Sequence, residues 1–146
     1  MRVLVQRVAS SSVSVDGTVI GKIGIGLLLL VGFGKDDKES VIPKMAEKVA
    51  NLRIFPDKEG RFHCSLLDIN GGVLVVPQFT LYGDTTKGRR PDFFGAMDPS
   101  EASGYVDVFK QELKSAGINC VESGEFGANM QVELVNDGPV TILLEL

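Results

Sequence analysis

Several residue types that build active sites and cofactor sites are scarce in this sequence. It has no tryptophan, a single histidine and two cysteines, Cys64 and Cys120, among its 146 residues. The cysteines lie too far apart for the usual spacing of metal ligands, and His63 neighbours Cys64, so in a strand these two side chains point to opposite faces. We therefore expect no metal, no cofactor and no Cys–His nucleophile, and interpret the cysteines as reduced thiols of a cytosolic protein.

Motifs of the common nucleotide-binding and hydrolase folds are also missing. The sequence contains no G-x-S-x-G nucleophile elbow, no phosphate-binding G-x-x-x-x-G-K-[ST] loop and no strand–G-x-G-x-x-G–helix unit. An enzyme with this sequence therefore does not rely on a conventional nucleophile and base.

Long apolar segments and an excess of positive charge are absent as well. The uncharged stretch between Lys22 and Lys35 is interrupted by glycines and is shorter than the ~20 residues that span a bilayer. Residues 1–7 (MRVLVQR) lead directly into strand-like sequence without the layout of a signal peptide, which favours a cytoplasmic location. The net charge of −4 argues against a protein held on nucleic acid by bulk positive charge. We expect no membrane and no DNA partner, and only a local contact with any RNA.

The residues that are present fit one globular α/β domain over residues 1–146, since 44% of them are hydrophobic and 23% are charged. Strand patterns recur along the chain, at residues 1–8, 13–15, 18–20, 27–31, 73–81, 130–134 and 139–146. The tight turns between the early strands predict a meander, and a turn at residues 136–138 precedes the last strand. The sheet is therefore expected to be mostly antiparallel.

Two long helices are expected to pack on this sheet. Ser40 is the predicted N-cap of the first, with Pro43 in the first turn, and its buried face is predicted to hold Val41, Met45, Val49 and Leu52. The second begins at Asp98 with Pro99 and Glu101 in a capping-box pattern and ends at Gly117. Its predicted buried face holds Ala102, Tyr105, Phe109, Leu113 and Ala116.

Two segments are unusual for regular strands. Pro77 and Gln78 interrupt an apolar run, and since proline has no backbone donor, the strand should lie at an edge or end in a bulge there. On this segment alone a strand end is favoured. Residues 136–141 (NDGPVT) match a hairpin turn, yet Pro139 cannot donate to a ladder and restricts Gly138. A cis bond between these two residues is left open.

A cluster of cations stands out on this acidic chain. Lys87, Arg89 and Arg90 would form a local anion site, because each arginine can bind a phosphate through two N–H donors. A solvated loop explains the same charges about equally well.

Motifs along the whole chain resemble one family. They are MRVLVQRV at residues 1–8, NLRIF at 51–55, QFTLY at 78–82, KGRRP at 87–91, FGA at 126–128 and NDGPVT at 136–141. Together they resemble the D-aminoacyl-tRNA deacylases. The joint presence of the QFTLY and N-x-G-P-V-T motifs is highly specific for that family, whereas either one alone would be weak.

The resemblance implies a homodimer with a partly barrel-shaped sheet and a metal-free, cofactor-free hydrolase. Its substrate would be the 3′ end of aminoacyl-tRNA, from which it releases D-amino acids, and glycine mischarged on tRNA(Ala). The catalytic residues would be Gln78, Phe79 and Thr80, with backbone N–H groups around Phe79 and Thr80 as donors to the oxyanion. The 2′-hydroxyl of the terminal adenosine would help to activate water, which explains the missing nucleophile. Thr80 as a covalent nucleophile is the weaker hypothesis.

The resemblance also assigns residues to selectivity. A Gly138–Pro139 cis pair would reach from one subunit into the other's site, where its carbonyls exclude an L side chain. Arg7 would hold that pair in place, and the rest of the motif, Asn136, Val140 and Thr141, would support it.

Further residues would bind the tRNA end. Phe126, Ala128 and Met130 resemble the wall that receives the terminal adenine, although core packing explains Met130 nearly as well. Lys87, Arg89 and Arg90 would bind phosphates.

One position departs from the family pattern, since most members have serine where this chain has Pro77. A hydroxyl role is thereby lost at this position. A relaxed deacylase acting on mischarged L-alanyl-tRNA is therefore kept as an alternative, as is a non-catalytic module that binds the tRNA end.

Overall fold

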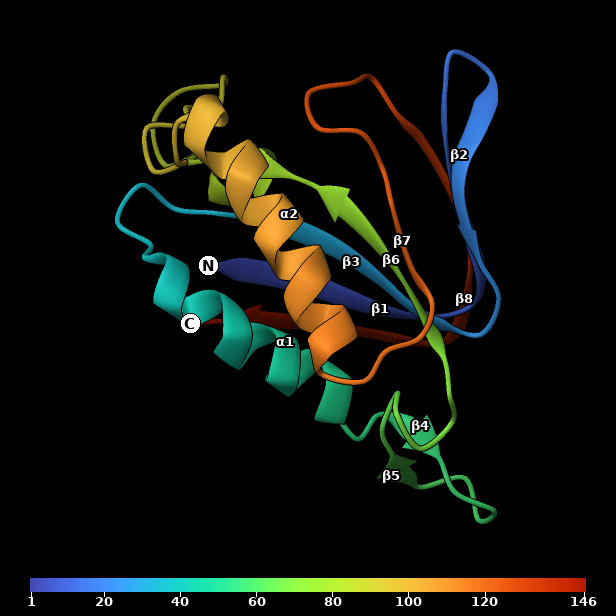
Figure 1. Cartoon of the computed structure of the whole chain (residues 1–146). Coiled ribbons are helices and arrows are strands. Elements are labelled where there is room, and N and C mark those ends of the chain that lie inside the picture. Colours follow the sequence, from blue (N-terminus) through green and yellow to red (C-terminus); the bar gives the residue numbers. More distant parts are fainter.

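The sheet is built around one long strand, β1, which pairs antiparallel with three others. The computed structural model describes residues 1–146, and its sheet runs in the order β2-β1-β3-β6-β7, with β8 also paired to β1 (Figure 1). The strands are β1 (Arg2–Val15), β2 (Thr18–Ile23), β3 (Gly26–Gly32), β6 (Gly72–Pro77), β7 (Val121–Ser123) and β8 (Gln131–Glu145), with a small separate hairpin of β4 (Phe55–Pro56) and β5 (Phe62–Cys64). The helices are α1 (Ile42–Asn51) and α2 (Pro99–Ser115), with two 3-10 turns, η1 (Glu39–Val41) and η2 (Phe79–Tyr82).

The predicted meander of the early strands was wrong, because β3 pairs with β1 and not with β2. The sheet is also mixed, where a mostly antiparallel sheet was expected. β3 pairs with β6 in parallel, and β6 pairs with β7 in parallel. Parallel neighbours need a crossover connection. The segment that contains α1 supplies it between β3 and β6, and the segment that contains α2 supplies it between β6 and β7. A single α/β fold with two long helices is confirmed.

The sheet curls until it is nearly a barrel. A Cβ atom placed on Gly21 of β2 would lie 3.0 Å from the carbonyl oxygen of Ser123 in β7, so the two ends of the sheet almost meet. A small core fills the curled part, formed by Val8, Val13, Ile23, Leu28, Leu74 and Val76.

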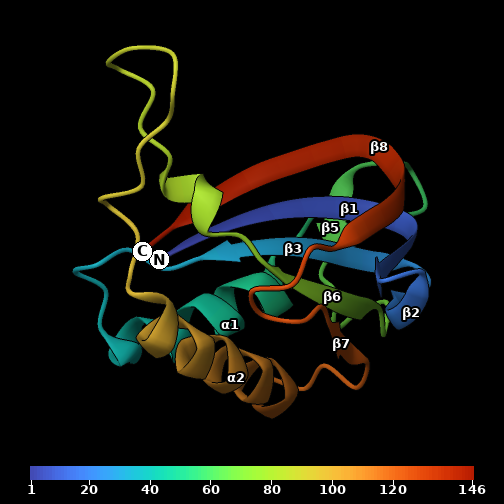
Figure 2. The same cartoon turned by 90° about the horizontal axis from the view of Figure 1, so that it is seen from above.

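The main core lies between the sheet and the two helices, which cover one face side by side (Figures 1 and 2). Val3 and Val5 of β1 are fully buried in it, as their alternation predicts, in the same cluster as Phe109 and Leu113 of α2. Burying these side chains is the main favourable term for folding.

Capping residues in the sequence predicted the ends of α2 more accurately than the start of α1. The Asp98 carboxylate accepts a hydrogen bond of 2.9 Å from the Ser100 N–H, and Gly117 follows the helix with φ +100°, as predicted. In α2, Val106 is buried although the predicted face omitted it, whereas Tyr105 and Ala116 are only half-buried.

The predicted Ser40 cap of α1 was wrong. Ser40 lies inside η1, and Val41 takes the cap position without a side-chain hydrogen bond. The helix therefore starts later than expected, so Ile42, Met45 and Val49 are buried, while Val41 and Leu52 are half-buried at its ends.

The two unusual segments have different structures. β6 ends at Pro77, which confirms the predicted strand end, but residues 79–82 turn into η2 instead of continuing the strand. The predicted turn at 136–138 was wrong, because β8 runs through these residues and only its register with β1 shifts. The Gly138–Pro139 bond is cis.

Gly26 provides a test of the parallel pairing. A Cβ at Gly26 would lie 1.9 Å from the carbonyl oxygen of Gly72, whereas one at the nearby Gly24 would have no atom within 4 Å. We expect Gly26→Ala to lower the free energy of unfolding by about 1–3 kcal/mol or more, because the backbones of β3 and β6 must move apart to make room for the methyl group. Gly24→Ala, the matched control, should stay within about 0.5 kcal/mol of wild type. Urea unfolding measures both, and equal losses would contradict this packing.

Candidate active site

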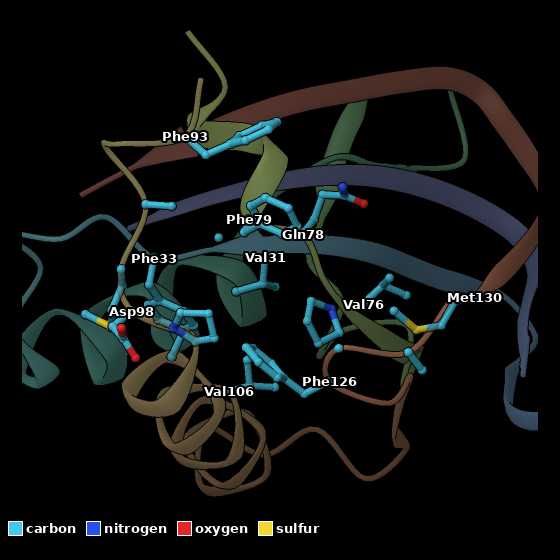
Figure 3. Close-up of a pocket in the computed structure, with 18 of the residues that line it drawn as sticks. Val31, Phe33, Val76, Gln78, Phe79, Phe93, Asp98, Val106, Phe126 and Met130 are labelled. Atoms are coloured by element: carbon cyan, nitrogen blue, oxygen red, sulfur yellow. The ribbon is translucent and has the colours of Figure 1, made fainter. Parts of the chain in front are cut away.

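An apolar pocket of about 770 Å³ lies where β3 and β6 end and α2 begins. In Figure 3, Val31 and Val76 of these strands lie between Phe79 above and Phe126 below. The lining residues come from five parts of the chain and are Val31–Phe33, Val76–Phe79, Phe93, Phe94, Ala96–Pro99, Ala102, Val106, Phe126–Ala128, Met130 and Val132.

Five of the predicted site residues meet in this pocket although they lie far apart in the sequence. Gln78 and Phe79 line it together with Phe126, Ala128 and Met130, and Figure 3 shows Phe79 and Phe126 on opposite sides. Thr80 follows Phe79 in η2, is exposed, and does not line the pocket.

The backbone around η2 offers hydrogen-bond donors at the pocket edge. The Gln78 N–H donates to the Val31 carbonyl at 2.7 Å, and the Leu81 N–H donates to the Gln78 carbonyl at 3.3 Å. The N–H groups of Phe79 and Thr80 are the first of the 3-10 turn, so they have no acceptor inside it. The Gln78 side-chain amide donates to the Thr80 hydroxyl.

The other end of η2 is fixed by a group of polar contacts that the sequence did not reveal. The Asp37 carboxylate pairs with the Met1 ammonium at 2.6 Å and accepts a hydrogen bond of 3.2 Å from the Tyr82 hydroxyl. Burial, and then the charge of Asp37, raise the pKa of Tyr82 to about 12. Arg2 donates to the Leu81 carbonyl at 2.8 Å and lies over the Tyr82 ring. These contacts hold η2 against β1 and β3.

Asp98 is the one ionisable residue that lines the pocket, and it is already engaged. Hydrogen bonds from the Ser100 hydroxyl and backbone N–H lower the pKa of the Asp98 carboxyl. It therefore serves as the cap of α2 in its charged form. No group of three His, Cys, Asp or Glu side chains could hold a metal ion, and both cysteines are free.

Gly138 and Pro139 do not line the pocket of their own chain; both are exposed. The Arg7 side chain, only 7% exposed, donates from Nε to the Asp137 carbonyl at 2.8 Å and lies 3.2 Å from the Asp137 carboxylate. A Cβ on Gly138, whose φ is +134°, would lie 2.9 Å from Val140 and 3.2 Å from Arg7. Arg7 therefore lies directly against this segment.

The remaining motif residues differ in environment. Asn136 is exposed opposite Val8, Val140 is buried, and the Thr141 hydroxyl accepts a hydrogen bond of 3.4 Å from Gln6.

The three predicted cations lie in a loop rather than in the pocket. Lys87, Arg89 and Arg90 are all exposed, and none makes an ion pair. The loop stands out beyond η2 in Figure 2. Its neck is closed by two backbone hydrogen bonds of 2.9 and 3.0 Å between Asp84 and Asp92.

Sequence comparison decides the family. The family model described as D-Tyr-tRNA(Tyr) deacylase matches residues 4–145. A protein of Roseiflexus castenholzii named D-aminoacyl-tRNA deacylase is 59% identical over 145 residues, which cover 99% of this chain and 92% of that protein. The chain belongs to the D-aminoacyl-tRNA deacylase family. A deacylase of the same name from Bacillus thuringiensis is 51% identical and covers 99% of each chain. The predicted family is confirmed.

Two solved structures share the deacylase fold seen here. One, titled "c-Myc DNA Unwinding Element Binding Protein", superposes with a TM-score of 0.93 at 40% identity and covers 100% of this chain and 99% of its own. The other, titled as a probable eukaryotic D-amino acid tRNA deacylase, has a TM-score of 0.88 at 18% identity and covers 99% and 98%. At 18% identity, the second structure shows only that the two proteins share a fold.

The sequence did not reveal the part of this pocket that α2 and the loop before it provide. Val106 and Phe33 have the spacing of ordinary core residues, and Asp98 was assigned only as a cap. The one available signal for Val106 was its position one helical turn after Ala102.

No helix of the chain is long and apolar enough to span a membrane.

Proposed function

We propose that this protein hydrolyses the ester bond of D-aminoacyl-tRNA, and of glycyl-tRNA mischarged on tRNA(Ala), to release the free amino acid and tRNA. One observation carries the proposal: Gln78 and Phe79 of the first family motif share a single apolar pocket with Phe126, Ala128 and Met130. The names of the relatives at 51–59% identity support the same activity.

The pocket suits an adenosine ester. Apolar walls formed by Phe126, Ala128 and Met130 would enclose the terminal adenine and remove it from water. The ester carbonyl would then lie at the edge formed by η2, where the N–H groups of Phe79 and Thr80 would donate to the developing oxyanion. Removing one such donor typically costs ~2.7–4 kcal/mol of transition-state stabilisation.

The base must come from the substrate, because the pocket offers none. Its one carboxylate, Asp98, is occupied as a helix cap, and it contains no histidine or lysine. In the proposed reaction the 2′-hydroxyl of the terminal ribose helps water to attack the ester carbonyl, and the 3′ oxygen leaves with the tRNA. The protein contributes orientation and oxyanion donors.

Chiral selection would come from a second copy of the chain. Gly138 and Pro139 are exposed and lie outside their own pocket, so they are available to complete the site of a partner. Their carbonyls would occupy the space of an L side chain, which excludes L-amino acids whatever the side chain is. An apolar strip on the sheet face opposite the helices supports a homodimer: Leu143 is 48% exposed and pairs with the half-buried Leu4.

The tRNA would be bound through a small contact. Lys87, Arg89 and Arg90 have no acidic partner, so they would be free to bind phosphates near the 3′ end. The net charge of −4 would discourage broad binding of RNA or DNA. We propose a cytoplasmic location, where aminoacyl-tRNA is used.

Pro77 favours one second candidate. It lines the pocket at the end of β6, where a proline supplies neither a hydroxyl nor an N–H donor. A relaxed deacylase that also cleaves L-alanyl-tRNA follows if Pro77 weakens the exclusion of L-amino acids.

A panel of esters separates these functions. We expect purified protein to cleave D-tyrosyl-tRNA and glycyl-tRNA and to leave L-tyrosyl-tRNA intact, measured as the release of radiolabelled amino acid. Cleavage of L-alanyl-tRNA at a rate comparable with the D-ester would favour the relaxed deacylase. If the protein cleaves none of these esters, the proposed enzymatic activity is wrong, and only a module that binds the tRNA end remains.

The source of the base can be tested directly. We expect a D-tyrosyl-tRNA whose terminal adenosine lacks the 2′-hydroxyl to be cleaved at least about 100-fold more slowly, since general base catalysis contributes 10²–10⁴-fold. Thr80→Ala should keep most of the activity, like Thr85→Ala, a matched control in the exposed loop. Normal turnover of the 2′-deoxy ester, or complete inactivation by Thr80→Ala alone, would show that the mechanism is wrong.

A further inference from the structure

Phe94 is the most exposed large hydrophobic side chain of the protein, yet it lines the pocket. Its exposed fraction is 85%, whereas Phe79, also at the pocket, is 57% exposed. The neighbouring Phe93 is half-buried and packs edge-on against Phe79, with ring centroids 4.9 Å apart. Phe94 has no such ring partner. Its ring is therefore a free aromatic surface at the solvent edge of the pocket.

The backbone around Phe94 is fixed by hydrogen bonds. The Phe94 N–H donates to the Asp92 carboxylate at 3.3 Å, and the Ala96 N–H donates to the Phe93 carbonyl at 2.9 Å. The Lys35 N–H donates to the Gly95 carbonyl at 3.0 Å, which ties the segment to the end of β3. A ligand that contacts the ring therefore does not have to order the chain first, which lowers the cost of binding.

The loop just before Phe94 carries unpaired positive charge. Lys87, Arg89 and Arg90 lie in it and have no acidic partner. A free aromatic ring in the same segment of the chain as unpaired cations is a combination with which proteins bind single-stranded nucleic acid, since the ring stacks on a base while the cations contact the phosphates. An acidic or purely apolar partner would match only one of these two features.

We infer that Phe94 is the stacking surface for the unpaired base that precedes the terminal adenosine of tRNA. The inference rests on the proposed function. With the terminal adenosine in the pocket, the preceding nucleotide would lie outside it, at the solvent edge where Phe94 is exposed. Stacking on a ring tolerates any base, so the contact would serve all tRNAs alike.

Kinetics with two substrates test the contact. With D-tyrosyl-tRNA, we expect Phe94→Ala to raise KM by about 5-fold to 150-fold, the range that stacking of one base provides, and to change kcat by less than about 2-fold. With 3′-O-D-tyrosyl-adenosine, which has no preceding nucleotide, KM should not change. Phe94→Leu keeps apolar bulk without an aromatic face and should behave like Phe94→Ala, whereas Phe94→Trp should restore the wild-type KM.

A binding measurement separates this inference from the proposed reaction. An uncharged RNA hairpin ending in a single-stranded 3′ tail carries 2-aminopurine in place of the base before the terminal adenosine. We expect its fluorescence to be quenched by wild type and Phe94→Trp but not by Phe94→Ala or Phe94→Leu. Ile25→Ala, which truncates a 63% exposed side chain of another loop, is the control and should quench like wild type.

Three results would overturn the stacking role. The first is equal quenching by wild type and Phe94→Ala, which shows that the base lies elsewhere. The second is an equal rise of KM for the tRNA and for the adenosine ester, which assigns Phe94 to the pocket itself. The third is a change of oligomeric state in Phe94→Ala by analytical ultracentrifugation with quenching retained, which means that a second copy covers the ring. Because the hairpin carries no ester, its quenching is informative even if no ester is cleaved.

Discussion

The hydrogen-bonded burial of the Arg7 guanidinium is the constraint on which the arrangement of this molecule depends. A buried charge is tolerated only when its donors find acceptors. Arg7 finds them in the Asp137 carbonyl and carboxylate and in the Ile54 carbonyl, and its guanidinium lies 5.6 Å from the centre of the Phe62 ring. One side chain of the central strand thereby contacts β8 where its register with β1 shifts, the segment after α1 and the β4–β5 hairpin. At this register shift Gly138 and Pro139 are exposed, and they do not line the pocket of their own chain.

The pocket explains why so few catalytic side chains are needed. Its walls are apolar, and its one carboxylate, Asp98, caps α2. The hydrogen-bond donors at its edge are backbone amides of η2, and contacts of Asp37, Tyr82 and Arg2 hold this turn in place. Such a site can orient an ester and stabilise an oxyanion but cannot supply a base. The proposed division of labour follows: the substrate activates water, a partner excludes L-amino acids, and the loop with Phe94 and its cations holds the tRNA end.

Local chemistry made part of the fold predictable. Asp98, Pro99 and Gly117 mark the ends of α2 because capping depends on neighbouring residues only. The parallel pairing of β3 with β6 depends on contacts between distant segments, which no local pattern encodes. The NDGPVT segment has the composition of a turn, but its partner across the sheet, including Arg7, keeps it within β8. In the pocket, Gln78, Phe79 and Phe126 were predictable through family resemblance. Val106 was not, because a residue that lines a pocket between elements has the same helical spacing as one in the core.

Complementation between two defective variants tests most directly whether two copies share each site. Gly138→Ala would spoil the wall that a subunit offers to its partner, and Ala128→Trp would fill a subunit's own pocket. Gly138→Ala alone should cleave L-tyrosyl-tRNA as well as the D-ester, and Ala128→Trp alone should cleave neither. Co-expressed in equal amounts, the two should cleave the L-ester about half as fast relative to the D-ester as Gly138→Ala does alone, because in half of the dimers the intact pocket of one subunit faces the intact Gly138 of the other. An unchanged ratio of L-ester to D-ester cleavage would contradict a shared site.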